Sequence, residues 1–539
     1  MKLPGSDNSS RPSMTSNMTS SLSGHLFNGL RFCRSRKCVF IILCCLLGIF
    51  KLVYQFTPTQ FRYTISLGSY TLPCEMPMLD PFDPKQMKNV RKVDPIKCHE
   101  RHNPVFVDDK NIVQFNKTVL GYLELKSSQI KCICQKIVRA NYSDNDVNLS
   151  EELTCTPPYN VSSDFFKIKC RTSDNKVIVD TILTKVFRTS WDFRSVRDDF
   201  YNVILFGIDS VSRNDAQRQI PFTVKYLKEL GAIEMLLHNR IGGHSFDNIL
   251  PLITGHFANH VDIPYYDVVG ERFEHFPFIW KNMSENYYAT FHAEDVLGFN
   301  TFNFQKEGFS TQPTTHYMRP FWQMDYDSRP NTLFWKESTT SYNKRRCLVN
   351  KPKYLIQIEY LKQFIHTYRD VRKFAMSHIN DLAHEDVNEL HQAEGHLLDF
   401  LKWLKSSDNL ENTFLIVYSD HGPRGQSSTH QSTMETNLPF LCIVPPKNLT
   451  KKYPDVITNL QRNAQLLTTH FDLYATLRDI VLRNYGTPSV YYVNDRPRGI
   501  SLFRNIGKQR SCQGLYPKPE VSWPTTLVHE RKMHADKIY

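Results

Sequence analysis

Apolar runs and helix-period segments alternate along the second half of the chain. The run NVILFGI is apolar throughout and ends at Asp209, as expected of a strand that is buried on both faces. Apolar residues recur at helical spacing over 220–227 and are followed by Gly231, which predicts a helix that ends at the glycine. This strand-then-helix order is the first sign of a parallel sheet.

The same alternation returns nearer the C-terminus. Residues 386–407 show a helical apolar stripe, and the run TFLIVY then leads into Asp420 and His421. Residues 465–482 predict another amphipathic helix. Strands that alternate with helices predict an α/β domain with a mostly parallel sheet flanked by helices, and we place it at 196–510.

Residues 57–195 show a different pattern, with short alternating runs and many cysteines. Short alternating runs, KTVLGYLEL at 117–125 and NKVIVDTILTKVF at 175–187, predict strands. Six of the nine cysteines that follow the N-terminal apolar run lie here. The pattern predicts a β-rich stem domain stapled by disulfides, and it shows no catalytic constellation.

The N-terminus predicts a membrane anchor. Residues 1–24 are rich in Ser, Asn, Thr and Met, which is typical of disorder, and basic residues then precede an apolar stretch. We expect a cytoplasmic tail over 1–37 and a transmembrane signal anchor over 38–56. A cleaved signal peptide is the alternative, but no small-residue cleavage site follows the stretch. Residues 511–539 are expected to form a C-terminal tail.

This topology is that of a single-pass type II membrane protein with its large domain in the Golgi lumen or outside the cell. N-glycosylation sequons follow the anchor at Asn116, Asn141, Asn148, Asn160, Asn282 and Asn448. An oxidising compartment favours disulfides among the cysteines beyond the anchor, with connectivity left open. Cys442, inside an apolar run, is the candidate for the unpaired one.

Charge narrows the class of partner. The formal net charge is +12, which favours anionic partners such as phosphate or sulfate esters, acidic glycans or a membrane surface. The basic residues form no long block of the kind found in nucleic-acid-binding arms, so we exclude nucleic acid as the partner. Oligomeric state is left open.

Two strand-end positions carry the candidate chemistry. Asp209 follows one buried run, and Asp420 and His421 follow another. Function in a parallel sheet gathers beyond the carboxyl ends of the strands, so these side chains can meet although they are far apart in the sequence. Asp and His are metal ligands. Two neighbouring metal ions can stabilise both the attacking and the leaving oxygen when an ester is cleaved by displacement. An Asp-His-Gly turn without metal is the alternative.

Four passages carry a resemblance to a known family: NVILFGIDSVSRNDAQRQIPFTVKYLKELGAIEM, HSFDNILPLITG, FHAEDV, and LIVYSDHGPRG with the later TNLPFLCIVPP. The chain resembles the alkaline-phosphatase/sulfatase superfamily and, within it, the animal ectodomain family called domain of unknown function 229. The resemblance spans roughly residues 70–510 and implies an alkaline-phosphatase-like core. The segment THFDLYATLRDI also resembles a late segment of sulfatase-like domains.

The resemblance implies roles for particular residues. Asp209, Asp420 and His421 match metal ligands, and Ser245 matches the nucleophile, whose hydroxyl would be activated by the metal. A helix beginning near Ser245 would present N–H groups to an anion. One or two divalent metals are expected, either zinc or one of calcium, magnesium and manganese.

The second metal half-site is less sharply marked. Asp381 and His384 are the expected ligands, although their spacing is one residue shorter than in many members, and His378 and Asp386 compete for these places. The later histidine of this half-site is expected at His430, with His470 as the alternative. Helix caps and loop residues are the ordinary alternatives for all of these. An acidic pair, Glu294 and Asp295, matches the family and either lines the pocket or forms a solvated loop.

The chain also departs from the pattern. Ser245 replaces the cysteine that would become formylglycine in a typical sulfatase, and the motif C-x-P-x-R is absent. Within the resembled family, Thr and a following Pro are expected where this chain has Ser245 and Asp247. The hydroxyl is kept, but Asp247 adds a negative charge near an anion site. The expected function is a membrane-anchored, metal-dependent hydrolase or transferase of phosphate or sulfate esters, including anionic glycan or lipid esters. The alternative is an inactive sulfatase-like ectodomain with a binding or matrix role.

Overall fold

The structure is a computed structural model. It describes residues 78–98, 103–195, 199–257, 272–327, 346–348, 350–424, 429–486, 498–508 and 510. These all belong to one compact unit, which runs from Thr71 to Tyr539. The expected cytoplasmic tail, anchor and C-terminal tail lie outside the described residues, as do Cys74 and Cys512. Among the residues that are described, no helix has both the length and the apolar character needed to cross a bilayer.

A seven-stranded sheet forms the centre of the large domain. Its strand order is β10-β18-β17-β9-β16-β12-β13. Five neighbouring strands are parallel: β17 (Thr413–Tyr418), β9 (Asn202–Ile208), β16 (Lys373–Ile379), β12 (Ala289–Glu294) and β13 (His316–Tyr317). At one edge, β18 (Leu441–Val444) runs antiparallel to β17, and β10 (Ile233–Glu234) runs antiparallel to β18. The expected α/β class with a mostly parallel sheet is confirmed.

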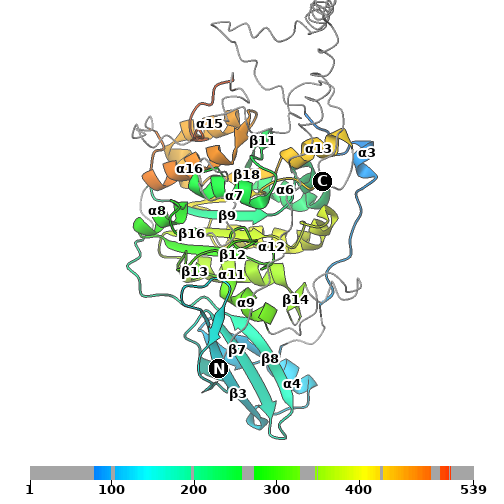
Figure 1. Ribbon diagram of the computed structural model, residues 1–539, viewed down its shortest axis with the longest axis vertical. Coiled ribbons are helices and arrows are strands. Elements are labelled where there is room, and N and C mark those ends of the chain that lie inside the picture. Colours follow the sequence, from blue (N-terminus) through cyan, green and yellow to red (C-terminus); the bar gives the residue numbers. More distant parts are fainter. Residues whose placement is uncertain are drawn as a thin grey trace, which may run out of the picture. The chain divides into compact units, whose positions relative to one another are not determined.

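Helices cover both faces of this sheet, which explains why its strands are apolar on both sides (Figure 1). One face packs against α5 (Arg213–Gln219), α6 (Pro221–Glu229), α11 (Lys353–Thr367) and α12 (Glu394–Ser406). The other packs against α7 (Ser245–Thr254), α8 (Ile279–Glu285), α15 (Pro454–Asn463) and α16 (His470–Leu482). All seven residues of β9 are buried, so this strand lies in the middle of the core.

A second, antiparallel sheet follows the order β4-β3-β7-β8, with β5 paired to β3. Its strands are β3 (Ile130–Arg139), β4 (Val147–Leu149), β5 (Leu153–Thr154), β7 (Phe165–Thr172) and β8 (Val177–Thr184). Disulfide Cys132–Cys170 links β3 to β7, and Cys134–Cys155 links β3 to the residue that follows β5. The strand expected within 175–187 is confirmed as β8.

The strand expected over 117–125 is wrong. Lys117–Tyr122 forms a helix, α4, because the Asn116 side chain accepts a hydrogen bond from the Val119 N–H and caps its first turn. Val119 and Leu120 are both buried although they are adjacent, a burial pattern that a half-buried strand does not have.

Two expected helices begin later than their patterns suggest. Over 386–407, the first part is a 3-10 helix, η2 (Val387–Ala393), and α12 starts only at Glu394. Over 465–482, Thr468–Thr469 forms β19, which pairs in parallel with β11 (His238–Asn239), so α16 starts at His470. The helix expected near 220–231 is confirmed as α6, which ends at Glu229, just before the left-handed Gly231.

The remaining elements are short. They are α3 (Pro84–Met87), β1 (Val105–Val107), β2 (Ile112–Phe115), η1 (Ser127–Gln129), β6 (Tyr159–Asn160), α9 (Arg319–Asp327), β14 (Cys347–Leu348), β15 (Lys351–Pro352), α13 (His430–Asn437) and α14 (Lys447–Lys452).

A third disulfide joins distant parts of the chain. Cys98 pairs with Cys347, 249 residues later, so the segment before the antiparallel sheet is tied to the α/β domain. The same segment also contacts α13 and α5: Gln86 Nε2 donates to Thr429 Oγ1 at 2.5 Å, and Arg218 Nη1 donates to the Pro81 carbonyl at 2.9 Å. Cys442 is buried and unpaired, as expected.

Replacing both members of this long-range disulfide, in a Cys98→Ser/Cys347→Ser variant, is expected to lower the free energy of unfolding by about 2–5 kcal/mol. The cause is the larger conformational freedom that the unfolded chain regains. Urea titration of the wild type and the double variant measures the difference. Peptide mapping without reduction should recover Cys98 linked to Cys347, and a link from either cysteine to Cys74 or Cys512 would contradict the pairing.

Candidate metal centre

The strand register brings two acidic strand ends together. Tyr418 of β17 and His378 of β16 both lie beside Gly207 of β9, so Asp209 and Asp420 emerge at the same edge of the sheet. Both carboxylates are buried, and so is His421. The His421 Nε2 lies 3.4 Å from Asp420 Oδ2 and 3.9 Å from Asp209 Oδ1. The meeting of these three residues, expected from the sequence, is present in the structure.

Ser245 reaches the same place from a different element. It is the first residue of α7, it is half-buried, and its Oγ donates to Asp209 Oδ2 at 3.5 Å. The preceding loop is held by the buried Asn248, whose Oδ1 accepts the N–H groups of Ile241 and Gly242 at 2.6 and 3.0 Å. The Asn248 amide also donates to carbonyls of the same loop, which holds the start of α7 in position beside the strand ends.

Asp247, which departs from the resembled pattern, has a local structural role. Its Oδ2 accepts the backbone N–H of His244 at 3.0 Å and so caps the start of α7. Glycine is required at 242 because a Cβ there would lie 2.1 Å from the Asp247 Cβ. A carboxylate in the first turn also suits the positive end of the helix dipole.

His378 completes the cluster from near the carboxyl end of β16. Asp209, His378 and Asp420 each offer a ligand atom, and these atoms lie within 4.8 Å of one another. The ring stacks on Tyr418 with centroids 5.5 Å apart, and a Cβ at Gly207 would lie 2.2 Å from His378 Nδ1. The sequence raised His378 only as a competitor for the other half-site, because a histidine inside a buried run resembles an ordinary core residue.

The electrostatics of the two carboxylates differ. Burial, and then the neighbouring charge of Asp420, raise the pKa of Asp209 well above its ordinary value. Burial also acts to raise the pKa of Asp420, but His421, His378 and hydrogen bonds from Ser245 and the Ser210 N–H outweigh it, so this pKa is lowered. Burial lowers the pKa of both histidines, so they are held as neutral imidazoles, the form that binds metals.

Several ligand atoms of this cluster have no hydrogen-bond partner among the described residues. Within the part of the chain that is described, Asp420 Oδ2, His421 Nε2 and both ring nitrogens of His378 are buried without a hydrogen bond. His421 Nδ1 lies 2.9 Å from the Gly422 carbonyl, and a proton shared there leaves Nε2 as a lone-pair donor towards the carboxylates. Buried polar atoms seldom lack partners. Two carboxylates and two imidazoles are a suitable donor set for zinc or a similar divalent cation, so these residues fit a metal site.

The expected second half-site is not assembled from Asp381 and His384 in the described residues. The buried Arg346 lies 3.1 Å from Asp381 Oδ2 through its Nε and also pairs with Glu389 at 2.6 Å. His384 Nδ1 lies 2.8 Å from Glu385 Oε1, and its ring stacks on Phe299. Neither residue belongs to the cluster around Asp209, and their metal role stays a prediction.

Among the described residues, His430 and Asp386 are not part of this cluster of ligand atoms, whereas His470 lies beside it. His430 is exposed at the start of α13, and Asp386 accepts from Asn388 and pairs with Arg91. His470 is buried, and its Nε2 lies 3.3 Å from the Ser419 carbonyl, so it supports the turn that carries Asp420. Burial lowers the pKa of His470 to about 4.

The acidic pair at the end of β12 is buried, so it is not a solvated loop. Glu294 accepts the Thr301 N–H at 2.8 Å; burial opposes ionisation, but His292 and His378 lower the pKa of Glu294 to about 2. Asp295 accepts the Asn380 N–H at 2.7 Å, while burial and the charge of Asp381 raise the pKa of Asp295 to about 7.

Comparison with protein families gave one match. The model of the family described as "Protein of unknown function (DUF229)" matches residues 91–520. A search of the curated proteins found no match.

Comparison with solved structures gave distant similarities. The lipoteichoic acid synthase LtaP from Listeria monocytogenes is 13% identical, with 59% of this chain and 79% of that chain covered and a TM-score of 0.36. The lipooligosaccharide phosphoethanolamine transferase A of Neisseria meningitidis is 9% identical, with 53% of this chain and 56% of that chain covered and a TM-score of 0.37. A protein in the alkaline phosphatase superfamily from Vibrio parahaemolyticus is 13% identical, with 54% of this chain and 68% of that chain covered and a TM-score of 0.33. Similarities of this size assign no substrate to this chain.

Removing one ligand is expected to abolish tight metal binding. Asp420→Asn should lower the affinity for Zn²⁺ or Mn²⁺ by more than about 100-fold, since even changes outside the ligand shell cost 10–100-fold. Calorimetric titration of the purified full chain measures this. Asp381→Asn is the matched control and should change the affinity by less than about tenfold, because Asp381 is paired with Arg346. Equal losses in the two variants would contradict the site.

Asp295 should make stability depend on pH. Its carboxyl holds a proton more tightly in the folded chain than in the unfolded chain, so folding stability falls as pH rises from about 4 to about 7. Asp295→Asn keeps an acceptor for Asn380 but cannot ionise. Its stability should therefore fall less over this window, by up to about 1.4 kcal/mol per pH unit. Urea unfolding at pH 4.5 and 8 checks this, and identical pH slopes for the two proteins would refute it.

Proposed function

We propose that this chain, which belongs to the family described as "Protein of unknown function (DUF229)", is a metal-dependent hydrolase or transferase of phosphate or sulfate esters, with Ser245 as its nucleophile. One observation carries the proposal. The Ser245 hydroxyl lies 3.5 Å from Asp209 Oδ2, at the half-buried edge of the cluster. In this cluster, buried ligand atoms of Asp420, His421 and His378 have no hydrogen bond among the described residues.

The position of Ser245 suits attack on an anionic ester. As the first residue of the ten-residue helix α7, it lies where backbone N–H groups have no acceptor inside the helix. Such a helix start binds phosphate and sulfate oxygens and favours negative charge. The hydrogen bonds of Asp247 and Asn248 to the backbone hold this turn in place. The Ser245 hydroxyl and the N–H groups of the first turn of α7 can therefore face the substrate without reorganisation.

The metal ligands and Ser245 would have different roles in the first displacement. A divalent cation held by Asp209, Asp420 and His421, with His378 beside them, would lower the pKa of the serine hydroxyl and polarise the ester. Ser245 Oγ then forms a bond to phosphorus or sulfur as the bond to the alcohol oxygen breaks. The serine proton passes to the adjacent Asp209 carboxylate and from there, through solvent, to the departing alcohol, so Asp209 is ionised again.

A second displacement regenerates the enzyme. Water, in a hydrolase, or the hydroxyl of an acceptor, in a transferase, attacks the seryl ester. The bond to Ser245 Oγ breaks, and the proton lost by the attacking group returns to Ser245. The overall basic charge and the anchor expected at 38–56 support substrates that are anionic esters in the lumen or outside the cell, on glycans, on lipids or free in solution.

A non-catalytic ectodomain with a binding or matrix role is the second candidate. The observation that favours it is the engagement of Asp381 by Arg346 and of His384 by Glu385 and Phe299. A superfamily-type site with two metals needs a second set of ligands, and the residues expected for that set are committed to these other contacts. A centre with one metal would still serve catalysis by Ser245, which is why the hydrolase or transferase is preferred.

Ser245→Ala is expected to lower kcat/KM for any turned-over ester by at least about 1,000-fold while leaving metal affinity within about tenfold, since it removes only the nucleophilic oxygen. The measurement is turnover of a panel of phosphate and sulfate esters by the full chain in detergent, with metal content determined in parallel. Ser245→Thr keeps the hydroxyl and is the matched control that should retain activity. Bound metal with no turnover of any ester by the wild type would favour the binding ectodomain instead.

A further inference from the structure

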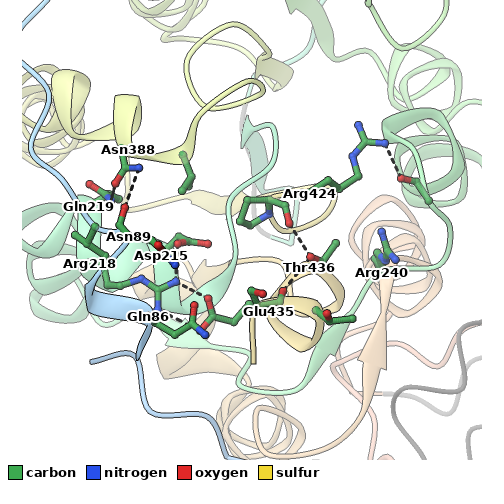
Figure 2. Close-up of a pocket in the computed structure, with 16 residues that line it drawn as sticks. Gln86, Asn89, Asp215, Arg218, Gln219, Arg240, Asn388, Arg424, Glu435 and Thr436 are labelled. Carbon is green, nitrogen blue, oxygen red and sulfur yellow. Dashed lines mark hydrogen bonds and ion pairs between the residues drawn. The ribbon is translucent and has the colours of Figure 1, made fainter. Parts of the chain in front are cut away.

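A cavity of about 400 Å³ lies between α5, α13 and the segment around residues 86–90 (Figure 2). Its volume is within the range of ligand sites, about 300–1,000 Å³. The lining comes from parts of the chain that are far apart in sequence: Gln86, Asn89, Val90, Asp215, Arg218, Gln219, Arg240, Gly243, Val387, Asn388, Pro423, Arg424, Ser432, Thr433, Glu435 and Thr436.

The cavity shares a wall with the candidate metal centre. Gly243, which lines it, stands two residues before Ser245, a separation of at most about 7 Å along the chain. Arg424, which also lines it, follows His421 by three residues. The Arg424 Nη1 donates to the Gly243 carbonyl at 3.1 Å and lies 3.1 Å from His244 Nδ1. It therefore connects the two chain segments that form this wall.

Charge is distributed unevenly along the cavity. At one side, the buried Arg218 pairs with Asp215 at 2.6 Å and with Glu435, so two carboxylates surround one guanidinium. At the other side are Arg240 and Arg424 (Figure 2). The field therefore draws an anionic group towards Ser245 and leaves the far side to a neutral group.

The lining has the chemistry of a site for hydroxyl groups. Among the described residues, no aromatic side chain lines it, and the aliphatic or proline residues are Val90, Val387 and Pro423. Side-chain amides and hydroxyls, which both donate and accept, make up most of the rest. Several are fixed by each other: Gln219 Nε2 donates to Asn388 Oδ1 at 2.8 Å, and Thr436 Oγ1 donates to the Pro423 carbonyl at 2.6 Å.

One buried donor in this wall also has no partner. The Arg218 Nε is buried and makes no hydrogen bond within the described ranges, although its terminal nitrogens are engaged. The Arg218 side chain is only 4% exposed, and such groups are normally satisfied.

We propose that this cavity binds the hydroxyl-rich alcohol part of the ester, a sugar residue, while the phosphate or sulfate group lies at Ser245. The proposal rests on the function proposed above and narrows its substrate class to sugar esters. An alkyl chain would leave the amides, hydroxyls and charged groups of this lining without hydrogen-bond partners. A second anionic group would meet Asp215 and Glu435, and a nucleobase would find no aromatic side chain to stack on.

The test compares two esters that differ mainly in hydroxyl groups, glucose 6-phosphate and n-hexyl phosphate, with the corresponding sulfates run in parallel. Thr433→Trp fills the cavity from the exposed face of α13 and replaces no residue of the Arg218 network. The matched control is Thr458→Trp on α15. Thr458 is also exposed and makes the same kind of bond four residues back, to the Pro454 carbonyl, as Thr433 makes to the Thr429 carbonyl.

We expect the wild type to prefer the glucose ester in kcat/KM, and Thr433→Trp to lower kcat/KM for that ester by at least tenfold while changing the hexyl ester less than threefold. Thr458→Trp should change neither by more than twofold. A parallel loss for both esters in Thr433→Trp, no loss for either, or a wild-type preference for the hexyl ester would overturn the proposal.

Failure of the function and failure of the cavity proposal are distinguishable. If no ester is turned over, the hydrolase or transferase falls, and the cavity is then tested by calorimetric binding of glucose 6-phosphate to the full chain. Binding that survives Ser245→Ala and Thr458→Trp but weakens at least tenfold in Thr433→Trp supports the cavity as the sugar site. Absence of binding, or binding that Thr433→Trp leaves unchanged, overturns it.

Discussion

Two buried carboxylates share one small volume at the edge of the central sheet, and the rest of the site is arranged around this constraint. Asp209 and Asp420 are at most 1% exposed, and neither forms an ion pair with a lysine or arginine in the described parts of the chain. Like charges in a buried place disfavour each other's ionisation, and burial disfavours both. Neutral imidazoles from His378 and His421 supply lone pairs but no compensating positive charge. A divalent cation is the partner that balances such a cluster.

The fold provides the constraint through strand register. Gly207 lies between His378 and Tyr418 on the two neighbouring strands, and its missing side chain leaves room for both rings. Two residues further along, just beyond the ends of β9 and β17, Asp209 and Asp420 emerge together. The start of α7 places Ser245 beside them, and the turn after β17 carries Arg424 towards the adjacent cavity. The metal ligands, the nucleophile and the cavity wall are thus all set by elements packed on the same three strands.

Much of this arrangement could be predicted from the sequence. Long apolar runs ending in Asp209 and in Asp420-His421 indicate buried parallel strands, and parallel strands end at one edge. The position of Ser245 came from family resemblance, and the structure places its hydroxyl next to Asp209. His378 was less visible because its signal, a histidine within a buried strand, is shared by ordinary core residues. Asp381 and His384 have plausible ligand spacing, but spacing does not reveal that Arg346, from another part of the chain, engages Asp381. The helix at Lys117–Tyr122 was missed because the cap by Asn116 outweighed a short alternating pattern.

The proposed function depends on a divalent cation held by Asp209, Asp420 and His421 beside Ser245. Anomalous diffraction from crystals of the protein grown with Zn²⁺ or Mn²⁺ locates such a cation. One strong peak is expected within about 2.0–2.6 Å of oxygen or nitrogen atoms of these three side chains, with Ser245 at its open side. A peak held instead by Asp381 and His384, or no peak near Asp209 at a saturating metal concentration, would contradict the proposed metal site.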